Sequence, residues 1–215
     1  MRLPPAWILV TPGDVGEAER ARVPRLVERC LPSGLAGVLL REPAWGDRAL
    51  LEVARALRGL IADGWLAVHD RVHVAAAAEA DAVHLGWRSL APAEVRAFAP
   101  RSLALGFSAH ASDAPGAYAS CNYAFYGPVH DTPSKRGLVA PVGIAGLERA
   151  VRATSTPLWA LGGVRPDDVT EVLAAGAAGF AVLGGIARAP DPVAACRAYA
   201  AALSAARAEG EARPR

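Results

Sequence analysis

The 215-residue sequence predicts a single (β/α)8 barrel, and three observations support this fold class. Eight short apolar runs alternate with eight longer amphipathic stretches along the chain. Most of the runs are apolar at nearly every position, as in parallel strands that are buried on both faces. Polar residues and glycines gather directly after the runs, where barrel enzymes assemble their sites. A doubly wound open sheet is the structural alternative, because it has the same alternation of strands and helices.

The predicted strands are Trp7–Thr11, Gly37–Arg41, Trp65–His69, Ala82–Leu85, Leu103–Phe107, Tyr123–Tyr126, Leu158–Leu161 and Gly179–Leu183. The predicted helices lie near residues 17–31, 47–62, 71–79, 92–98, 112–120, 143–153, 166–175 and 191–208. One helix start is well marked, because Pro166 is followed by two aspartates that stabilise the positive end of a helix dipole. We expect one barrel domain over residues 1–208. The charged end of the chain, 209–215, predicts a flexible tail.

Composition argues against several classes of protein. The net charge is +2, with both signs mixed along the chain, so we expect neither a nucleic acid nor a membrane surface as partner. No apolar run reaches the ~18–20 residues that a membrane span requires. The first residues lack the apolar core of a secretory signal, which predicts a cytoplasmic location. The sequence allows a homodimer without specifying one.

The three cysteines have neither the spacing of metal ligands nor the even number of a disulfide framework. They are Cys30, Cys121 and Cys196. We interpret all three as small buried residues.

Glycines follow the last two predicted strands. They stand in Gly162-Gly163 and in Leu183-Gly184-Gly185. The loops after the seventh and eighth strands of a barrel commonly bind phosphate through backbone N–H groups and a helix N-terminus. Glycine lets the backbone approach such an anion closely. We therefore predict that the chain binds a small phosphate ester, although the same glycines could serve only to allow tight turns.

A polar loop follows the sixth predicted strand. It carries Thr132, Ser134 and Lys135, and Lys135 is the only lysine in the chain. Hydroxyls and cations of this kind can hold an anionic group and close over it. The loop therefore favours the same phosphate-binding interpretation.

Three histidines stand at or after predicted strand ends: His69, His110 and His130. Imidazole gains and loses protons near neutrality, so we predict that at least one of the three acts as an acid or a base. For each one, the alternative is a hydrogen-bonded structural role. We interpret His73, on a predicted helix, and His84, in or beside the fourth strand, as structural.

Seven short segments, in the same order, resemble the superfamily of thiamine phosphate synthases and thiazole tautomerases (TenI). They are Leu39–Glu42, His69–Arg71, Asp81–Gly86, Gly106–His110, the loop 127–137, Trp159–Gly163 and Gly179–Val182. Together they span almost the whole predicted barrel. The resemblance implies a barrel fold and an activity in thiamine biosynthesis.

In the synthases, a pyrimidine diphosphate loses pyrophosphate and the thiazole nitrogen captures the resulting cation. The resemblance then implies that Arg41, Ser108 and Lys135 contact the pyrophosphate, and that Asp70 binds Mg2+. It also implies that Gly163 and the Leu183-Gly184 backbone hold the thiazole phosphate. Neutralising a departing polyanion with cations agrees with these roles.

Three positions depart from the synthase pattern. Pro43 stands where the pattern has a lysine, His69 where it has an asparagine, and Ser89 where it has a second carboxylate for magnesium. The segment Trp87–Leu90 is more similar to the TenI branch. Enzymes of that branch shift a proton to aromatise a thiazole carboxylate phosphate, and they need no metal.

The catalytic histidine of the TenI branch would fall on Pro128. His130 lies two residues further on, and in an extended segment it would return to the same face. We therefore predict a TenI-type tautomerase that uses histidine acid/base chemistry and no cofactor. The alternative is a thiamine phosphate synthase with Mg2+, and a second alternative is a non-catalytic barrel that binds thiazole phosphate or thiamine phosphate.

Overall fold

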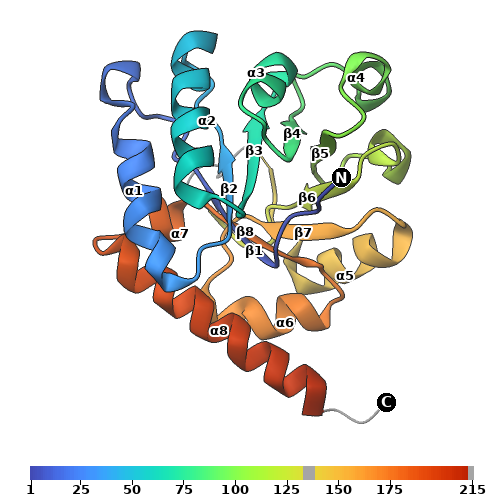
Figure 1. Ribbon diagram of the computed structural model, residues 1–215. Coiled ribbons are helices and arrows are strands. Elements are labelled where there is room, and N and C mark those ends of the chain that lie inside the picture. The colour runs from blue at the N-terminus through green and yellow to red at the C-terminus, as the bar shows by residue number, and fades with distance from the viewer. Residues whose placement is uncertain (133–138, 213–215) are drawn as a thin grey trace.

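The computed structural model describes residues 1–132 and 139–212, and it is a closed barrel of parallel strands (Figure 1). Neighbours in the chain are neighbours in the sheet, and the barrel closes where β1 pairs with β8, for example Ile8 with Ala181. The predicted fold class is confirmed, and the open-sheet alternative was wrong. Ser134 and Lys135 lie outside the described residues.

The strands follow the predicted runs closely. They are β1 (Trp7–Val10), β2 (Gly37–Leu40), β3 (Trp65–His69), β4 (Ala82–Leu85), β5 (Ala104–Ala109), β6 (Tyr123–Tyr126), β7 (Leu158–Leu161) and β8 (Gly179–Val182). The largest difference is in β5, which runs two residues past its predicted end at Phe107. As a result Ser108 lies within a strand, and the pleat fixes the direction of its side chain.

Helices cover the outside of the barrel. They are α1 (Arg22–Cys30), α2 (Asp47–Ile61), α3 (Val72–Ala77), α4 (Pro92–Phe98), α5 (Gly143–Ala153), α6 (Val169–Ala174), α7 (Gly184–Ala187) and α8 (Pro192–Ala212). Short 3-10 turns are η1 (Glu17–Glu19), η2 (Leu31–Ser33), η3 (Pro115–Tyr118) and η4 (Pro166–Asp168).

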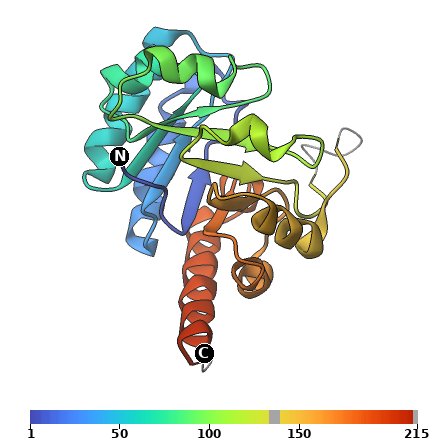
Figure 2. The same ribbon diagram turned by 90° about the vertical axis from the view of Figure 1, so that its right-hand side faces the viewer.

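Two helix predictions needed correction, and one short helix was missed. The helix expected near residues 112–120 was wrong, because only η3 forms there, and its Pro115 and Gly116 are poor helix formers. The short α7 was not predicted. Helix α8 continues to Ala212, beyond the predicted end at residue 208, and Figure 2 shows its end extending past the barrel. The flexibility of the tail stays a prediction.

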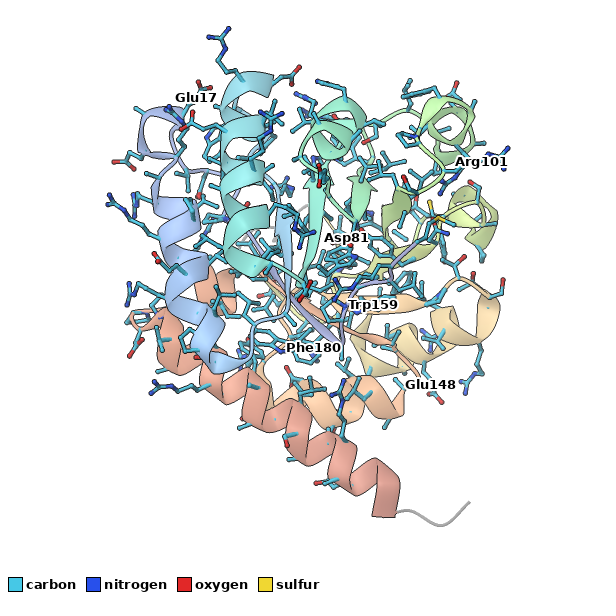
Figure 3. The ribbon with its side chains drawn as sticks, in the orientation of Figure 1. Glu17, Asp81, Arg101, Glu148, Trp159 and Phe180 are labelled. Atoms are coloured by element: carbon cyan, nitrogen blue, oxygen red, sulfur yellow. The ribbon has the colours of Figure 1, made fainter. Side chains whose placement is uncertain are left out.

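Alternation along the strands separates two apolar layers. The inner layer fills the barrel and consists of Ile8, Val10, Leu39, Trp65, Ala67, Ala82, Ala104, Tyr123, Phe125, Trp159 and Ala181. The outer layer lies between strands and helices, and it contains Phe180 and the three buried cysteines. Figure 3 shows Trp159 among the strands, whereas Glu17, Arg101 and Glu148 lie at the periphery. The prediction of buried cysteines is confirmed.

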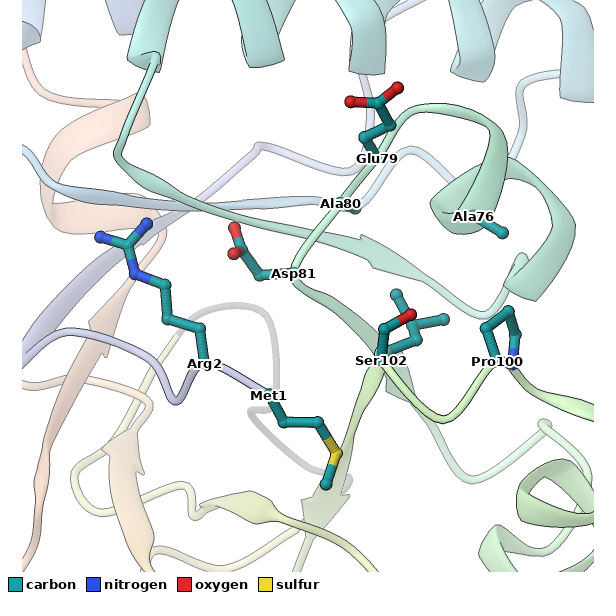
Figure 4. A pocket seen from close by; sticks show the side chains of 9 residues that line it. Met1, Arg2, Ala76, Glu79, Ala80, Asp81, Pro100 and Ser102 are labelled. Carbon is teal, nitrogen blue, oxygen red and sulfur yellow. The ribbon is translucent and has the colours of Figure 1, made fainter.

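The N-terminal segment covers the amino end of the barrel. The indole N–H of Trp159 donates to the carbonyl of Pro5 at 2.8 Å, and that of Trp65 donates to the carbonyl of Arg2 at 3.3 Å. An open cavity of about 590 Å³ lies beside this segment, with Arg2 and Asp81 on its walls (Figure 4). Asp81 is already paired with Arg58 at 2.9 Å. This end of the barrel is therefore a structural closure.

Within the described ranges, none of the helices combines the length and the apolar character that crossing a bilayer requires. The possible homodimer stays a prediction.

Candidate active site

Three predicted site residues point into the carboxyl end of the barrel. Arg41 directly follows β2, His69 ends β3 and Ser108 lies near the end of β5. Side chains alternate along a strand, so residues two or four positions apart share a face. The corresponding earlier residues all belong to the inner layer: Leu39, Ala67 and Ala104. The alternation therefore brings a cation, an imidazole and a hydroxyl to one opening.

The guanidinium of Arg41 is packed against the loop that follows β1. A Cβ at Gly13 would collide with Nη1 of Arg41, and Gly13 has a φ of +84°. Glu42, which sequence reasoning did not select, is 2% exposed and accepts hydrogen bonds from the N–H groups of Gly13 at 3.0 Å and Val15 at 3.2 Å. Its pKa is raised by burial. Glu42 thus holds the loop against which the Arg41 side chain rests.

His69 is neutral near neutrality. Burial, and next the charge of Arg41, lower its pKa from the ordinary 6.5 to about 4. Its Nε2 lies close to Gly86, where a Cβ would come within 3.0 Å of it. A group with so low a pKa holds a proton weakly, so it is poorly matched to acid/base work near pH 7. His69 is better suited to lining the site as a neutral side chain.

The lowered pKa of His69 predicts a pH dependence of stability. The unfolded chain binds a proton near pH 6.5, whereas the folded chain resists it until about pH 4. Folding therefore loses stability as the pH falls from 7 to 4, by about 3 kcal/mol for this residue. We expect His69→Gln to lose about 3 kcal/mol less than the wild type over that interval, measured by urea unfolding at each pH. Parallel curves for the two proteins would contradict the shift.

His84 lies in β4, as predicted, and its side chain contacts the site from the interior of the barrel. It is 1% exposed, and burial lowers its pKa well below the ordinary value, so the ring is neutral. Its Nε2 is 2.9 Å from Oγ of Ser108, and its Nδ1 is 3.2 Å from the hydroxyl of Tyr123. No pattern in the sequence predicted these contacts, because the three residues are distant in the chain. The interpretation of His84 as purely structural is therefore incomplete, because its side chain also contacts the site residue Ser108.

The glycines after β7 hold two loops together. Gly162 and Gly163 have φ values of +92° and +71°, and a Cβ at either would come within 2.7 Å of Pro128 or His130, respectively. The N–H of His130 also donates to the carbonyl of Gly162 at 3.0 Å. These glycines therefore serve close packing of the two loops.

The glycines after β8 differ from each other. A Cβ at Gly184 would meet open space, whereas one at Gly185 would collide with the hydroxyl of Tyr199. Gly184 begins α7 directly after Leu183, and its backbone is exposed. The exposed Gly184 is thus accessible to a ligand, and Gly185 is needed for packing.

The other two candidate histidines each lie near an aspartate. Nε2 of His130 is buried and lies 3.5 Å from Oδ2 of Asp168 in η4. The two groups are close enough for an ion pair, but they do not form a hydrogen bond. Nδ1 of His110 lies 3.5 Å from Oδ2 of Asp113. Thr132 is half-buried at the edge of the described loop.

Asp70 follows β3 with a φ of +65°. Its carboxylate is paired with Arg71 at 2.8 Å, and Arg71 also binds Asp47 at 3.1 Å. Ser89, at the position of the expected second carboxylate, accepts a hydrogen bond from the N–H of Gly86 at 2.8 Å through its Oγ. Asp70 is therefore a single carboxylate that already has a cationic partner.

The chain matches the family described as Thiamine monophosphate synthase (TMP-TENI) over residues 8–186. It belongs to this family. A thiamine-phosphate synthase of Xanthobacter autotrophicus is 40% identical over 84% of this chain and 88% of its own length. One of Laribacter hongkongensis is 36% identical over 80% and 83%, respectively. Among solved structures, a thiamine phosphate pyrophosphorylase from Pyrococcus furiosus has a TM-score of 0.79 and 26% identity, covering 93% of this chain and 96% of that one.

These similarities confirm the predicted superfamily and an enzyme of thiamine biosynthesis. They favour the synthases over the TenI branch that the segment Trp87–Leu90 predicted, because the similar proteins are named as synthases. Membership of the thiamine monophosphate synthase family implies thiazole or thiamine phosphates as ligands.

The described residues do not by themselves fit a resident Mg2+ of this family. Mg2+ prefers several oxygen ligands in near-octahedral geometry. Asp70 offers one carboxylate, which is shared with Arg71, and the described ranges contain no group of three histidine, cysteine or acidic side chains suited to a metal.

Proposed function

We propose that this chain is a thiamine-phosphate synthase, which joins a pyrimidine diphosphate to thiazole phosphate and releases pyrophosphate. The observation that carries the proposal is the similarity to proteins named as synthases over more than four-fifths of the chain. The inward-facing Arg41 and Ser108 support it, because they bring a cation and a hydroxyl to the carboxyl end of the barrel.

The chemistry of this transfer suits the described groups. The bond between the pyrimidine-bearing carbon and the diphosphate oxygen breaks, and its electron pair leaves with pyrophosphate. The lone pair of the thiazole nitrogen then forms the new C–N bond. Arg41 would neutralise charge that develops on the leaving group, and Ser108 would donate a hydrogen bond to it. Neither step needs a base with a pKa near 7, which agrees with the lowered pKa of His69.

We also propose where the phosphate groups bind. We place the thiazole phosphate at Gly163 and the Leu183-Gly184 turn, and the diphosphate nearer Arg41 and Ser108. Thr132, Ser134 and Lys135 belong to the loop that we expect to cover the diphosphate. Mg2+ would arrive as the counter-ion of the diphosphate, since Mg2+ commonly binds with substrate phosphates.

A TenI-type tautomerase is the second candidate, and the pair of His130 and Asp168 favours it. A carboxylate 3.5 Å from an imidazole can orient the ring for proton transfer. No metal or other cofactor would be needed. The two thiamine-phosphate synthases named above do not support this candidate.

A substrate-choice assay tests the proposal. Purified protein receives pyrimidine diphosphate, thiazole phosphate and Mg2+ in one reaction, and the unaromatised thiazole carboxylate phosphate in another. We expect sustained formation of thiamine phosphate in the first. Conversion of the thiazole in the second, with no coupling in the first, would establish the tautomerase instead. No turnover in either would favour the non-catalytic phosphate-binding barrel.

A further inference from the structure

A line of three polar groups runs through the interior of the barrel to its carboxyl end. It starts at the hydroxyl of Tyr123 on β6, passes through the imidazole of His84 on β4 and ends at Oγ of Ser108 on β5. Tyr123 is fully buried, whereas Ser108 is partly exposed at the opening. Gly106 makes this geometry possible, because a Cβ there would collide with the Tyr123 ring. The line therefore connects the buried interior of the barrel with the site.

The surroundings of Tyr123 determine which partner donates. Its ring packs on Trp65, Trp159 and Phe125 at centroid distances of 5.6, 5.9 and 5.6 Å, respectively. Both indole N–H groups are used elsewhere, on carbonyls of the N-terminal segment. Within the described part of the chain, Nδ1 of His84 is the hydrogen-bond partner of the Tyr123 hydroxyl. A buried hydroxyl proton without an acceptor is costly, so the hydroxyl donates to Nδ1.

This assignment fixes the tautomer of His84. A neutral imidazole carries one N–H, and if Nδ1 accepts, the proton is on Nε2. Nε2 then donates to Oγ of Ser108, 2.9 Å away. One lone pair of the Ser108 oxygen is thereby occupied, and its own proton is left to point elsewhere.

We propose that Tyr123 and His84 are positioning residues that orient the Ser108 hydroxyl as a hydrogen-bond donor to an anionic phosphate oxygen. The reverse order, from serine to histidine to tyrosine, would present only serine lone pairs to the anion and repel it. The identity of the ligand as a diphosphate rests on the proposed function, but the direction of the chain of hydrogen bonds does not.

Nitrogen NMR tests the direction without any substrate. Protonated and unprotonated ring nitrogens have well-separated 15N shifts, so long-range 15N–1H correlation of the labelled protein reads the tautomer of His84. His84→Gln assigns the signals by their loss. We expect the Nε2–H tautomer. The Nδ1–H tautomer would overturn the proposal even if the protein proved to be a synthase.

Pyrophosphate binding tests the consequence at Ser108. Tyr123→Phe removes the donor to Nδ1, and we expect it to weaken binding of inorganic pyrophosphate roughly five-fold, the size of one neutral hydrogen bond. In a Ser108→Ala background the same change should have no effect. Tyr118→Phe is the matched control, because Tyr118 is equally buried but lies in the outer layer.

Two results of the binding measurements would contradict the proposal. Unchanged affinity in Tyr123→Phe, or an equal loss with and without Ser108, would overturn the role of the line. If Tyr123→Phe does not fold, the NMR measurement on the wild type still decides the tautomer. If the wild type did not bind pyrophosphate but His84 had the Nε2–H tautomer, the proposed function would be contradicted. The direction of the hydrogen bonds from Tyr123 to Ser108 would still be supported.

Discussion

Arg41→Ala is expected to weaken pyrophosphate binding by roughly 10- to 100-fold, as for loss of a charge-assisted hydrogen bond of about 1.5–3 kcal/mol. Arg41 points inward after β2, and its charge already lowers the pKa of His69. Isothermal titration with inorganic pyrophosphate in the presence of Mg2+ measures the effect.

Two variants make this prediction specific. Arg41→Lys keeps the charge but loses the planar fork, so its affinity should fall between those of the wild type and Arg41→Ala. Arg152→Ala removes an exposed arginine that is paired with Glu148 on α5 at 2.7 Å, and it should bind like the wild type. Equal binding by Arg41→Ala and Arg152→Ala would remove Arg41 from the site.

Gly163→Ala is expected to destabilise the fold by about 2–4 kcal/mol, because a left-handed conformation and a collision add together. Its φ is +71°, and the new Cβ would lie 2.7 Å from Cβ of His130 and 2.9 Å from the carbonyl oxygen of Asp131. The loops after β6 and β7 would have to separate. Urea unfolding measures the loss, and titration with thiazole phosphate should show weaker binding.

Gly34→Ala is the matched control for this change. Gly34 has a φ of +83°, but a Cβ there meets nothing within 4 Å. We expect only the conformational cost, about 1–2 kcal/mol, and unchanged binding. If the two variants lost the same stability, the contact between the loops would contribute nothing.

The sequence predicted the frame of the site well, because it depends on local patterns. Continuous apolar runs located every strand, and the pleat then places Arg41 and His69 on the inward face. The end of β5 was harder to predict, since Ser108 interrupts the apolar pattern although Ser108 and Ala109 still pair with β6. The proline and glycine of η3 disfavour a regular α-helix, so the helix expected there does not form.

Contacts between distant strands could not be predicted from one sequence. Nothing near His84 in the chain indicates that it meets Tyr123 and Ser108, because the closed barrel brings them together. The lowered pKa of His69 likewise depends on burial and on Arg41 from another strand. Short motifs therefore suggested three candidate histidines, whereas the environment makes one of them a poor acid or base at neutral pH.

The most direct test of the proposed synthase is a 31P NMR time course with pyrimidine diphosphate, thiazole phosphate and Mg2+, run for the wild type and Arg41→Ala. We predict that one pyrophosphate is released for each thiamine phosphate formed, and that both rates fall together in the variant. Pyrophosphate release without thiamine phosphate, or coupling at equal rates in the two proteins, would contradict transfer at this end of the barrel.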